Sequence, residues 1–301
     1  MQGLKVGVHI LAGQAKGLVE GIVAAEAAGI EVAWMTSGGV AADPLAVFSA
    51  AALKTERILF GTCILPTFPR HPLAMVQGAM TVDSLAPGRL RLGIGPSHKP
   101  SIEGMYGIPF VRPLEHLREY LTILNGLLAG EPVRFSGELF KVNGQVSVAG
   151  AKKPPVLVAA LGPDMLRLCG RLADGTITWM GGIDYLRTVA MPTMSAAAAK
   201  AGRPAPRFVA MVPVLLTDDV DAGRETVNRV FQAYGQIPSY RATLDRGGAA
   251  TPADVAVIGD RSAVSAGLKA FEAVGVTDFV AAIPAGAPGE QATYEALATL
   301  A

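Results

Sequence analysis

The segment RILFGTCILPTFPRHPLAMVQGAMTVDSLAPGRLRLGIG, residues 57–95, contains two strand-like runs separated by a helix-like run. The outer runs, Ile58–Leu65 and Leu90–Pro96, are mostly continuous apolar sequence, which is typical of parallel strands buried on both faces. Pro72 stands where a helix over Leu73–Leu85 would begin. The segment therefore predicts one β–α–β unit of a parallel sheet.

The same alternation extends in both directions from this unit. Further strands are expected over Lys5–Leu11, Val32–Thr36, Val156–Gly162, Thr176–Met180, Phe208–Thr217 and Asp278–Pro284. Further helices are expected over Val19–Ala28, Leu45–Leu53, Pro113–Gly130, Pro163–Ala173, Tyr185–Ala201, Val220–Tyr234, Ser262–Val274 and Gly289–Leu300. Eight such units favour a single-domain (β/α)8 TIM barrel, an α/β fold, over an open doubly wound sheet.

Two segments depart from the repeat. Glu131–Lys153 has the pattern of a small hairpin turning near Ser136-Gly137, and Gln236–Asp254 is expected to be a loop-rich excursion before the last strand. Barrels of this type carry lids and substrate loops in such excursions.

Composition excludes several classes of function. The 301 residues hold 26 basic and 25 acidic side chains, so the chain lacks the basic surplus of a nucleic-acid binder. Two cysteines, Cys63 and Cys169, are too few for a disulfide framework or a cysteine zinc site. The first residues form a strand pattern and not a signal peptide. No apolar run reaches the roughly 20 residues that span a bilayer, so we expect a cytoplasmic protein with no membrane partner.

Common catalytic motifs are missing from the sequence. It has no GxSxG elbow, no HExxH and no Walker A loop, and LGIGPSH lacks the third glycine of the dinucleotide fingerprint. The four histidines lie in separate units with no ligand spacing, so no metal site is expected.

In a TIM barrel, the reactive groups lie at the carboxyl ends of the strands. Those ends carry His9, Thr36 and Ser37, Cys63 and Ile64, Ser97 and His98, Leu161, Gly162 and Pro163, and finally Thr178, Trp179 and Met180. Gly162-Pro163 at a helix start would leave free backbone N–H groups able to bind a phosphate, with the Thr178 hydroxyl as a second donor. An ordinary strand-to-helix turn would have the same sequence.

Several stretches of the chain resemble the luciferase-like monooxygenase superfamily, and within it the branch dependent on the deazaflavin coenzyme F420. They are AAEAAGIEVAWM (24–35), the 57–95 segment, GEPVRFSGELF (130–140) and PPVLVAALGPDMLRLCGRLADGTITWM (154–180). The resemblance implies a non-prolyl cis peptide at Cys63-Ile64 behind the deazaflavin ring. It also implies that Leu161, Gly162, Thr178, Trp179 and Met180 hold the cofactor phosphate, with Ser97, His98 and Pro163 beside them.

One position departs from the pattern of these relatives. Many of them carry an Asp-His pair after the second strand, where this chain has Ser37-Gly38. His98 is therefore our first candidate for a proton donor, because an imidazole titrates near neutrality. A structural histidine near Glu103 is the alternative. His9 is a weaker candidate and is expected to line the pocket.

The expected substrate pocket is largely apolar. It would be lined by Thr36, Ser37, Phe68, Met105 and Tyr240, with Phe110 and Met180 at its rim. Arg241 and Arg246 are either partners of the acidic F420 tail or solvated loop charges. Relatives commonly dimerise through the second and third helices. The alanine-rich helices Leu45–Leu53 and Leu73–Leu85 lead us to expect a homodimer here.

Three functions remain open at this point. The first is an F420-dependent oxidoreductase that transfers a hydride to or from a small, apolar substrate with an activated C=C or C=O bond. The second is an FMN-dependent monooxygenase of the same fold, against which the Cys-Ile pair argues. The third is an F420-binding protein without turnover, because the usual acid/base pair is missing.

Overall fold

The computed structural model describes residues 3–37 and 41–300. Within them, eight parallel strands close into a barrel in the order β10-β12-β1-β2-β3-β5-β8-β9, and β9 pairs again with β10. The strands are β1 (Lys5–His9), β2 (Val32–Met35), β3 (Leu59–Thr62), β5 (Leu90–Gly95), β8 (Val156–Ala159), β9 (Gly175–Trp179), β10 (Arg207–Leu216) and β12 (Asp278–Ala282). The predicted (β/α)8 barrel is confirmed.

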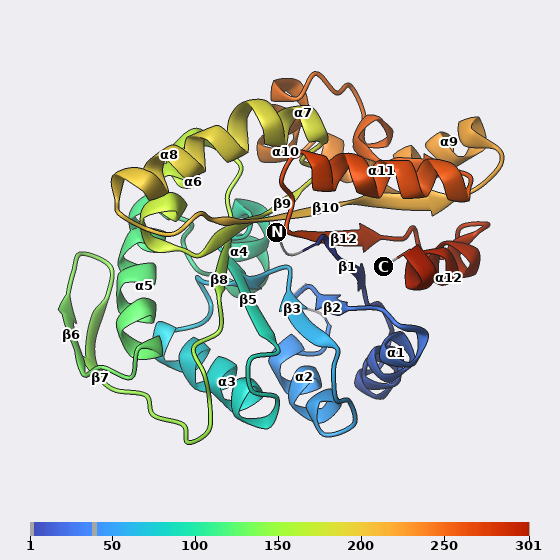
Figure 1. The fold of residues 1–301 in the computed structure, drawn as a ribbon. Coiled ribbons are helices and arrows are strands. Elements are labelled where there is room, and N and C mark those ends of the chain that lie inside the picture. The colour runs from blue at the N-terminus through green and yellow to red at the C-terminus, as the bar shows by residue number, and fades with distance from the viewer. Residues whose placement is uncertain (1–2, 38–40, 301) are drawn as a thin grey trace.

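Helices surround this barrel (Figure 1). They are α1 (Ala15–Ala28), α2 (Pro44–Ala52), α3 (Pro72–Leu85), α5 (Pro113–Leu128), α6 (Pro163–Leu172), α8 (Met191–Lys200), α9 (Val220–Phe231), α11 (Arg261–Ala273) and α12 (Glu290–Leu300). Short α7 (Ile183–Tyr185) and η1 (Leu186–Ala190) run directly into α8. Proline stands at the first turn of α2, α3, α5 and α6, where its missing N–H costs no helical hydrogen bond.

The excursion at Gln236–Asp254 corrects our expectation of a loop-rich segment. It contains the helix α10 (Pro238–Arg246), between the 3-10 turns η2 (Gln232–Gly235) and η3 (Pro252–Val255). The helix begins with Pro238 and ends at Arg246, with Gly247 as its C-cap, and it buries Thr243 and Leu244. A second helix, α4 (Lys99–Tyr106), was also missed, as was the short strand β11 (Val257–Gly259). The single strand predicted over Ile58–Leu65 is divided into β3 and the short β4 (Leu65–Pro66).

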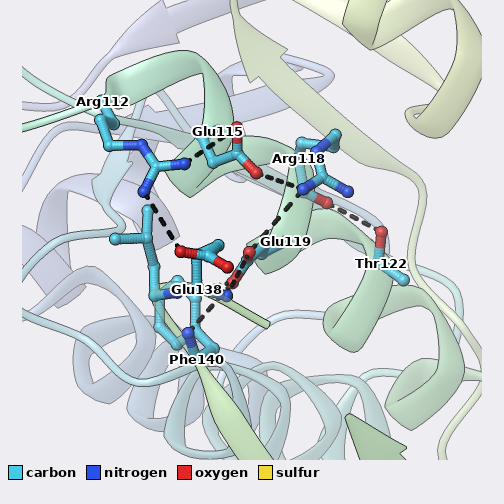
Figure 2. A network of polar contacts seen from close by, with 8 residues as sticks. Arg112, Glu115, Arg118, Glu119, Thr122, Glu138 and Phe140 are labelled. Carbon is cyan, nitrogen blue, oxygen red and sulfur yellow. Dashed lines mark hydrogen bonds and ion pairs between the residues drawn. The ribbon is translucent and has the colours of Figure 1, made fainter. Parts of the chain in front are cut away.

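The predicted hairpin is confirmed as β6 (Val133–Ser136) and β7 (Lys141–Gly144), which projects beside α5 in Figure 1. The buried carboxylate of Glu119 on α5 accepts the backbone N–H groups of Glu138, Leu139 and Phe140 at 2.9–3.0 Å (Figure 2). Burial by itself would raise the pKa of Glu119, but these hydrogen bonds and Arg118 hold that pKa below its ordinary value. The carboxylate thus fixes the hairpin to the barrel.

Side chains fill the barrel interior in layers. Trp34 is fully buried there, and an added Cβ on Gly7 or Gly61 would come within 2.7 Å of its ring. Val209, Ile177 and Val280 pack in the same interior cluster. At the amino-terminal end of the strands, Arg91 and Arg207 pair with the fully buried Asp278 at 2.7 and 3.3 Å. The carboxyl end is therefore the end left for chemistry.

None of the helices in the described ranges is both long enough and apolar enough to cross a membrane.

Candidate active site

The end of β3 has an irregular backbone. The peptide bond between Cys63 and Ile64 is cis, as the resemblance implied. The hydroxyl of Thr36 donates to the Cys63 carbonyl at 2.8 Å and lies 3.3 Å from its Sγ. The N–H of Ser37 donates to the Ile64 carbonyl at 3.3 Å. The structure thus brings together the predicted residues after β2 and β3; Gly38 lies outside the described residues.

The Cys63 side chain packs against the interior cluster that contains Trp34. Burial raises the pKa of the Cys63 thiol to about 12, and the Thr36 hydrogen bond opposes that change only in part. The thiol is therefore protonated at neutral pH and is a packing group, not a nucleophile.

Thr62 repairs the strand pairing next to this irregular segment. Its hydroxyl donates to the Gly93 carbonyl at 2.7 Å and accepts the Gly93 N–H at 2.7 Å. Strand β5 carries glycine at alternate positions here, and an added Cβ on Gly95 would lie 2.9 Å from Ala159 and 3.3 Å from Ile64. Thr62 and these glycines were not among the predicted site residues. The signal for them is the alternation of glycine in LRLGIG.

His98 follows β5 and meets Tyr240 of α10. Its Nε2 lies 3.0 Å from the Tyr240 hydroxyl, and the two rings are 5.1 Å apart at 64°. Ser97 directly before it has a φ of 63°, a left-handed conformation that costs a non-glycine residue energy and recurs at functional sites. Burial lowers the pKa of His98.

An aromatic series continues from Tyr240 across the barrel mouth. Tyr240 packs edge-on against Tyr234 at 5.4 Å, and Tyr234 against Trp179 at 5.3 Å. Trp179 also contacts Phe231 at 5.3 Å, and its indole Nε1 is buried without a hydrogen-bond partner in the described part of the chain. Helix α10 and η2 therefore add an aromatic wall, of which the α10 part was expected to be loop.

The start of α6 fits the predicted phosphate-binding role. Gly162 is its N-cap, no side chain caps the helix, and a Cβ added to Gly162 would meet nothing within 4 Å. The first N–H groups of a helix have no intrahelical acceptor, so they are free for an anion. Tyr185 donates to the Leu161 carbonyl at 2.7 Å and fixes the preceding turn. Asp164 in the first turn pairs with Arg167 at 2.5 Å.

The two residues at the end of β9, Thr178 and Trp179, have different surroundings. Trp179 belongs to the interior cluster, whereas the hydroxyl of buried Thr178 donates to the Val209 carbonyl at 3.3 Å. Thr178 therefore holds neighbouring strands together and its hydrogen is not free for an anion. Met180 has a φ of 60°, so both β5 and β9 are followed by a non-glycine residue in the left-handed region.

Other predicted pocket residues lie in different surroundings. Phe68 stacks on the ring of His116 at 3.8 Å and on Phe110 at 4.9 Å, in a cluster that packs against α5 and the hairpin. The Met105 side chain on α4 is 50% exposed. His9, the last residue of β1, is desolvated, which lowers its pKa to about 4. None of these three shares a hydrogen bond or ring contact with His98 or Tyr240 in the described residues.

The guanidinium of Arg241, on α10, is committed to groups outside the barrel mouth. Arg241 bonds to Asp245 at 2.9 Å and to the carbonyls of Ala249 and Ala250 at 2.6 Å, so its guanidinium ties α10 to the following turn. Within residues 3–37 and 41–300, no three His, Cys, Asp or Glu side chains group closely enough to hold a metal ion. The candidate site is thus lined mainly by aromatic side chains, together with the His98 imidazole and the N-terminus of α6.

Comparisons with known proteins agree with this architecture. The luciferase-like monooxygenase family matches residues 4–299 of the chain. An F420-dependent glucose-6-phosphate dehydrogenase from Mycolicibacterium fortuitum is 32% identical over 253 residues, which cover 77% of this chain and 74% of that protein. A protein of the same name from Beutenbergia cavernae is 34% identical over 197 residues, or 64% of this chain. The chain spans 58% of the length of that second relative.

Solved structures share the fold at lower identity. An F420-dependent secondary alcohol dehydrogenase, in complex with an F420-acetone adduct, superposes with a TM-score of 0.84 at 18% identity, covering 100% of this chain and 98% of that chain. The oxygenating constituent of a Pseudomonas putida 3,6-diketocamphane monooxygenase, in complex with FMN, gives 0.76 at 18% identity, covering 98% and 97%.

The predicted resemblance to the F420-dependent branch is confirmed by the names of these curated relatives. The family itself is established by a match that runs almost from end to end. The chain therefore belongs to the luciferase-like monooxygenase family.

Proposed function

We propose that this protein is an F420-dependent oxidoreductase that transfers a hydride between the deazaflavin and a small, apolar substrate with an activated C=C or C=O bond. The observation that carries the proposal is the identity of 32% over 253 residues with a relative named for F420 dependence. Bound F420 would supply the hydride, and the protein would supply binding, orientation and a hydrogen-bond donor.

The residues present fit such a cofactor. The uncapped N-terminus of α6 would hold its phosphate, since free N–H groups and the helix dipole both favour an anion. Cys63, Ile64 and Trp179 would contact its ring, because they form the apolar surface at the top of the interior cluster. His98 would face the substrate from the end of β5.

The charge of the site favours a neutral substrate. The site residues named above at the ends of β1, β2, β3, β5, β8 and β9 include no lysine or arginine, and Lys99, which directly follows His98, pairs with Glu103. A sugar phosphate carries about two negative charges, and burying them without a cation costs several kcal/mol. We therefore propose that the substrate differs from the glucose 6-phosphate in the names of the curated relatives.

An FMN-dependent monooxygenase is the second candidate, favoured by the shared fold with an FMN-bound oxygenating enzyme. The third candidate is an F420-binding protein without turnover, favoured by Ser37-Gly38 in place of the Asp-His pair. Both alternatives are separated from the proposal by which cofactor binds and whether hydride moves.

The test is a fluorescence titration of the purified protein with F420 and, in parallel, with FMN. We expect quenching by F420 with a Kd in the micromolar range or below, and no response to FMN. Reduced F420 should then be oxidised by cyclic enones or ketones and not affected by glucose 6-phosphate. Tight FMN binding without F420 binding would replace the proposal with the monooxygenase. F420 binding with no turnover of any acceptor would leave the binding protein.

A further inference from the structure

The contact between His98 and Tyr240 joins the barrel rim to the excursion that covers it. His98 belongs to the turn after β5, and Tyr240 lies 142 positions later, on α10. Their 3.0 Å contact uses Nε2 of the imidazole and the phenol oxygen. Within the described residues, no other hydrogen bond is made by either side chain. The contact therefore links the position of the hydrogen on the His98 ring to the direction of the Tyr240 hydroxyl hydrogen.

Both side chains are held in place by their surroundings. Ser97 turns the chain through a left-handed residue immediately before His98. Tyr240 is fixed by the edge of Tyr234 at 5.4 Å, and α10 is anchored by buried Leu244 and by the Arg241 hydrogen bonds to Ala249 and Ala250. The two rings are therefore held in a fixed relative position. Such preorganisation is required of side chains that take part in a reaction.

Hydrogen bonding then selects one form of the imidazole. Burial raises the pKa of Tyr240, so the phenol keeps its proton, and its O–H needs an acceptor. An unprotonated Nε2 is that acceptor. If Nε2 carried a proton instead, it would donate to the phenol oxygen, and the hydrogen of the phenol, the more deeply buried of the two groups, would have no acceptor among the described residues.

The charged groups around the pair do not oppose this form. Tyr234 of η2 packs on Tyr240 and is itself a neutral phenol whose pKa is raised by burial. On α4, Lys99 and Glu103 pair with each other at 3.9 Å. Desolvation, which disfavours the imidazolium, is the cause of the lowered pKa of His98. A neutral ring whose Nε2 accepts the phenol hydrogen of Tyr240 carries its own hydrogen on Nδ1.

We propose that Tyr240 is a positioning residue that holds His98 as the neutral Nδ1–H tautomer. The Nδ1–H group is then a hydrogen-bond donor. It would suit a substrate oxygen that gains negative charge as the carbon bonded to it is reduced. The opposite tautomer would present an acceptor there and suit proton removal from an alcohol. This role for the Nδ1–H group rests on the proposed function, whereas the tautomer itself does not.

The tautomer is measured directly in the protein without cofactor. Histidine labelled with nitrogen-15 gives distinct shifts for protonated and unprotonated ring nitrogens, and His98→Gln identifies the His98 signals. We expect the wild type at pH 7.5 to show a protonated Nδ1 and an unprotonated Nε2. In Tyr240→Phe the ring should change toward Nε2–H, the form preferred by free histidine. An Nε2–H ring in the wild type, or the same spectrum in both proteins, would overturn the proposal.

Kinetics gives the second readout. Tyr240→Phe should lower kcat with reduced F420 and an enone by about tenfold, the effect of one misplaced hydrogen bond. The Kd for F420 and the KM for the enone should stay within about twofold. Tyr294→Phe is the matched control, since its buried phenol on α12 has no partner in the described chain. An unchanged kcat in folded Tyr240→Phe would contradict the proposal.

The two proposals fail separately. If F420 does not bind but the wild type shows the Nδ1–H ring and Tyr240→Phe loses it, the function is wrong and the positioning role of Tyr240 stands. If F420 supports turnover but the ring is Nε2–H, the function stands and the positioning role is wrong.

Discussion

At the scale of single residues, the hydroxyl of Thr62 takes over the pairing that β3 loses before Cys63. It serves both the N–H and the carbonyl of Gly93 at 2.7 Å, in a fully buried position. Backbone groups buried without partners are rare because each costs about 1–3 kcal/mol. This one side chain therefore allows the irregular rim to exist inside a packed barrel.

Thr62→Val should be destabilising for that reason. It keeps the shape but leaves the Gly93 N–H and carbonyl unsatisfied, so we expect the free energy of unfolding to fall by about 2–4 kcal/mol. Thr62→Ser keeps the hydroxyl and should lose about 1 kcal/mol for the missing methyl group. Urea denaturation measures both. Equal stability of the two variants would show that the hydroxyl is not the important group.

At the scale of elements, the Glu119 carboxylate makes the hairpin part of the barrel. An added Cβ on Gly137 would lie 2.4 Å from this carboxylate, so the hairpin turn and the helix are closely fitted (Figure 2). Glu119→Gln replaces an acceptor of three N–H groups by an amide that also carries donors. We expect a loss of about 1.5–3 kcal/mol and faster hydrogen exchange at Leu139 and Phe140.

Glu115→Gln on the same helix is the control for that variant. Glu115 pairs with Arg118 at the surface, and such exposed pairs contribute little to stability. Hydrogen exchange in the hairpin should be unchanged in it. If Glu115→Gln and Glu119→Gln opened the hairpin equally, general helix destabilisation would explain the effect and the carboxylate would not.

Elements also show what the sequence can predict. The eight barrel strands were predictable because continuous apolar runs between helices have few other structures. Helices α4 and α10 were not, because the first buries only Ile102 and the second only Thr243 and Leu244, which leaves little periodic signal. The location of the site at the strand ends followed from topology. The pairing of His98 with Tyr240 did not, because it depends on the path of the chain over the barrel mouth.

At the scale of the whole molecule, the barrel separates a stabilising end from a reactive end. Asp278 is fully buried at the amino-terminal end between Arg91 and Arg207, whereas His98, Ile64 and the α6 start lie at the other. Asp278→Asn would remove the carboxylate that pairs with both the buried Arg91 and the partly exposed Arg207. Breaking a buried pair in this way costs about 3–5 kcal/mol.

The expected outcome is a protein that unfolds at lower temperature yet binds F420 with an unchanged Kd, because no strand-end group has moved. Thermal unfolding followed by circular dichroism and the fluorescence titration measure the two properties on the same sample. Glu20→Gln, which removes an exposed pair with Lys16, should change neither. A weakened cofactor affinity in folded Asp278→Asn would mean that the two ends are coupled through the interior layer of Trp34. The separation of stability from function along the barrel axis would then be incomplete in this protein.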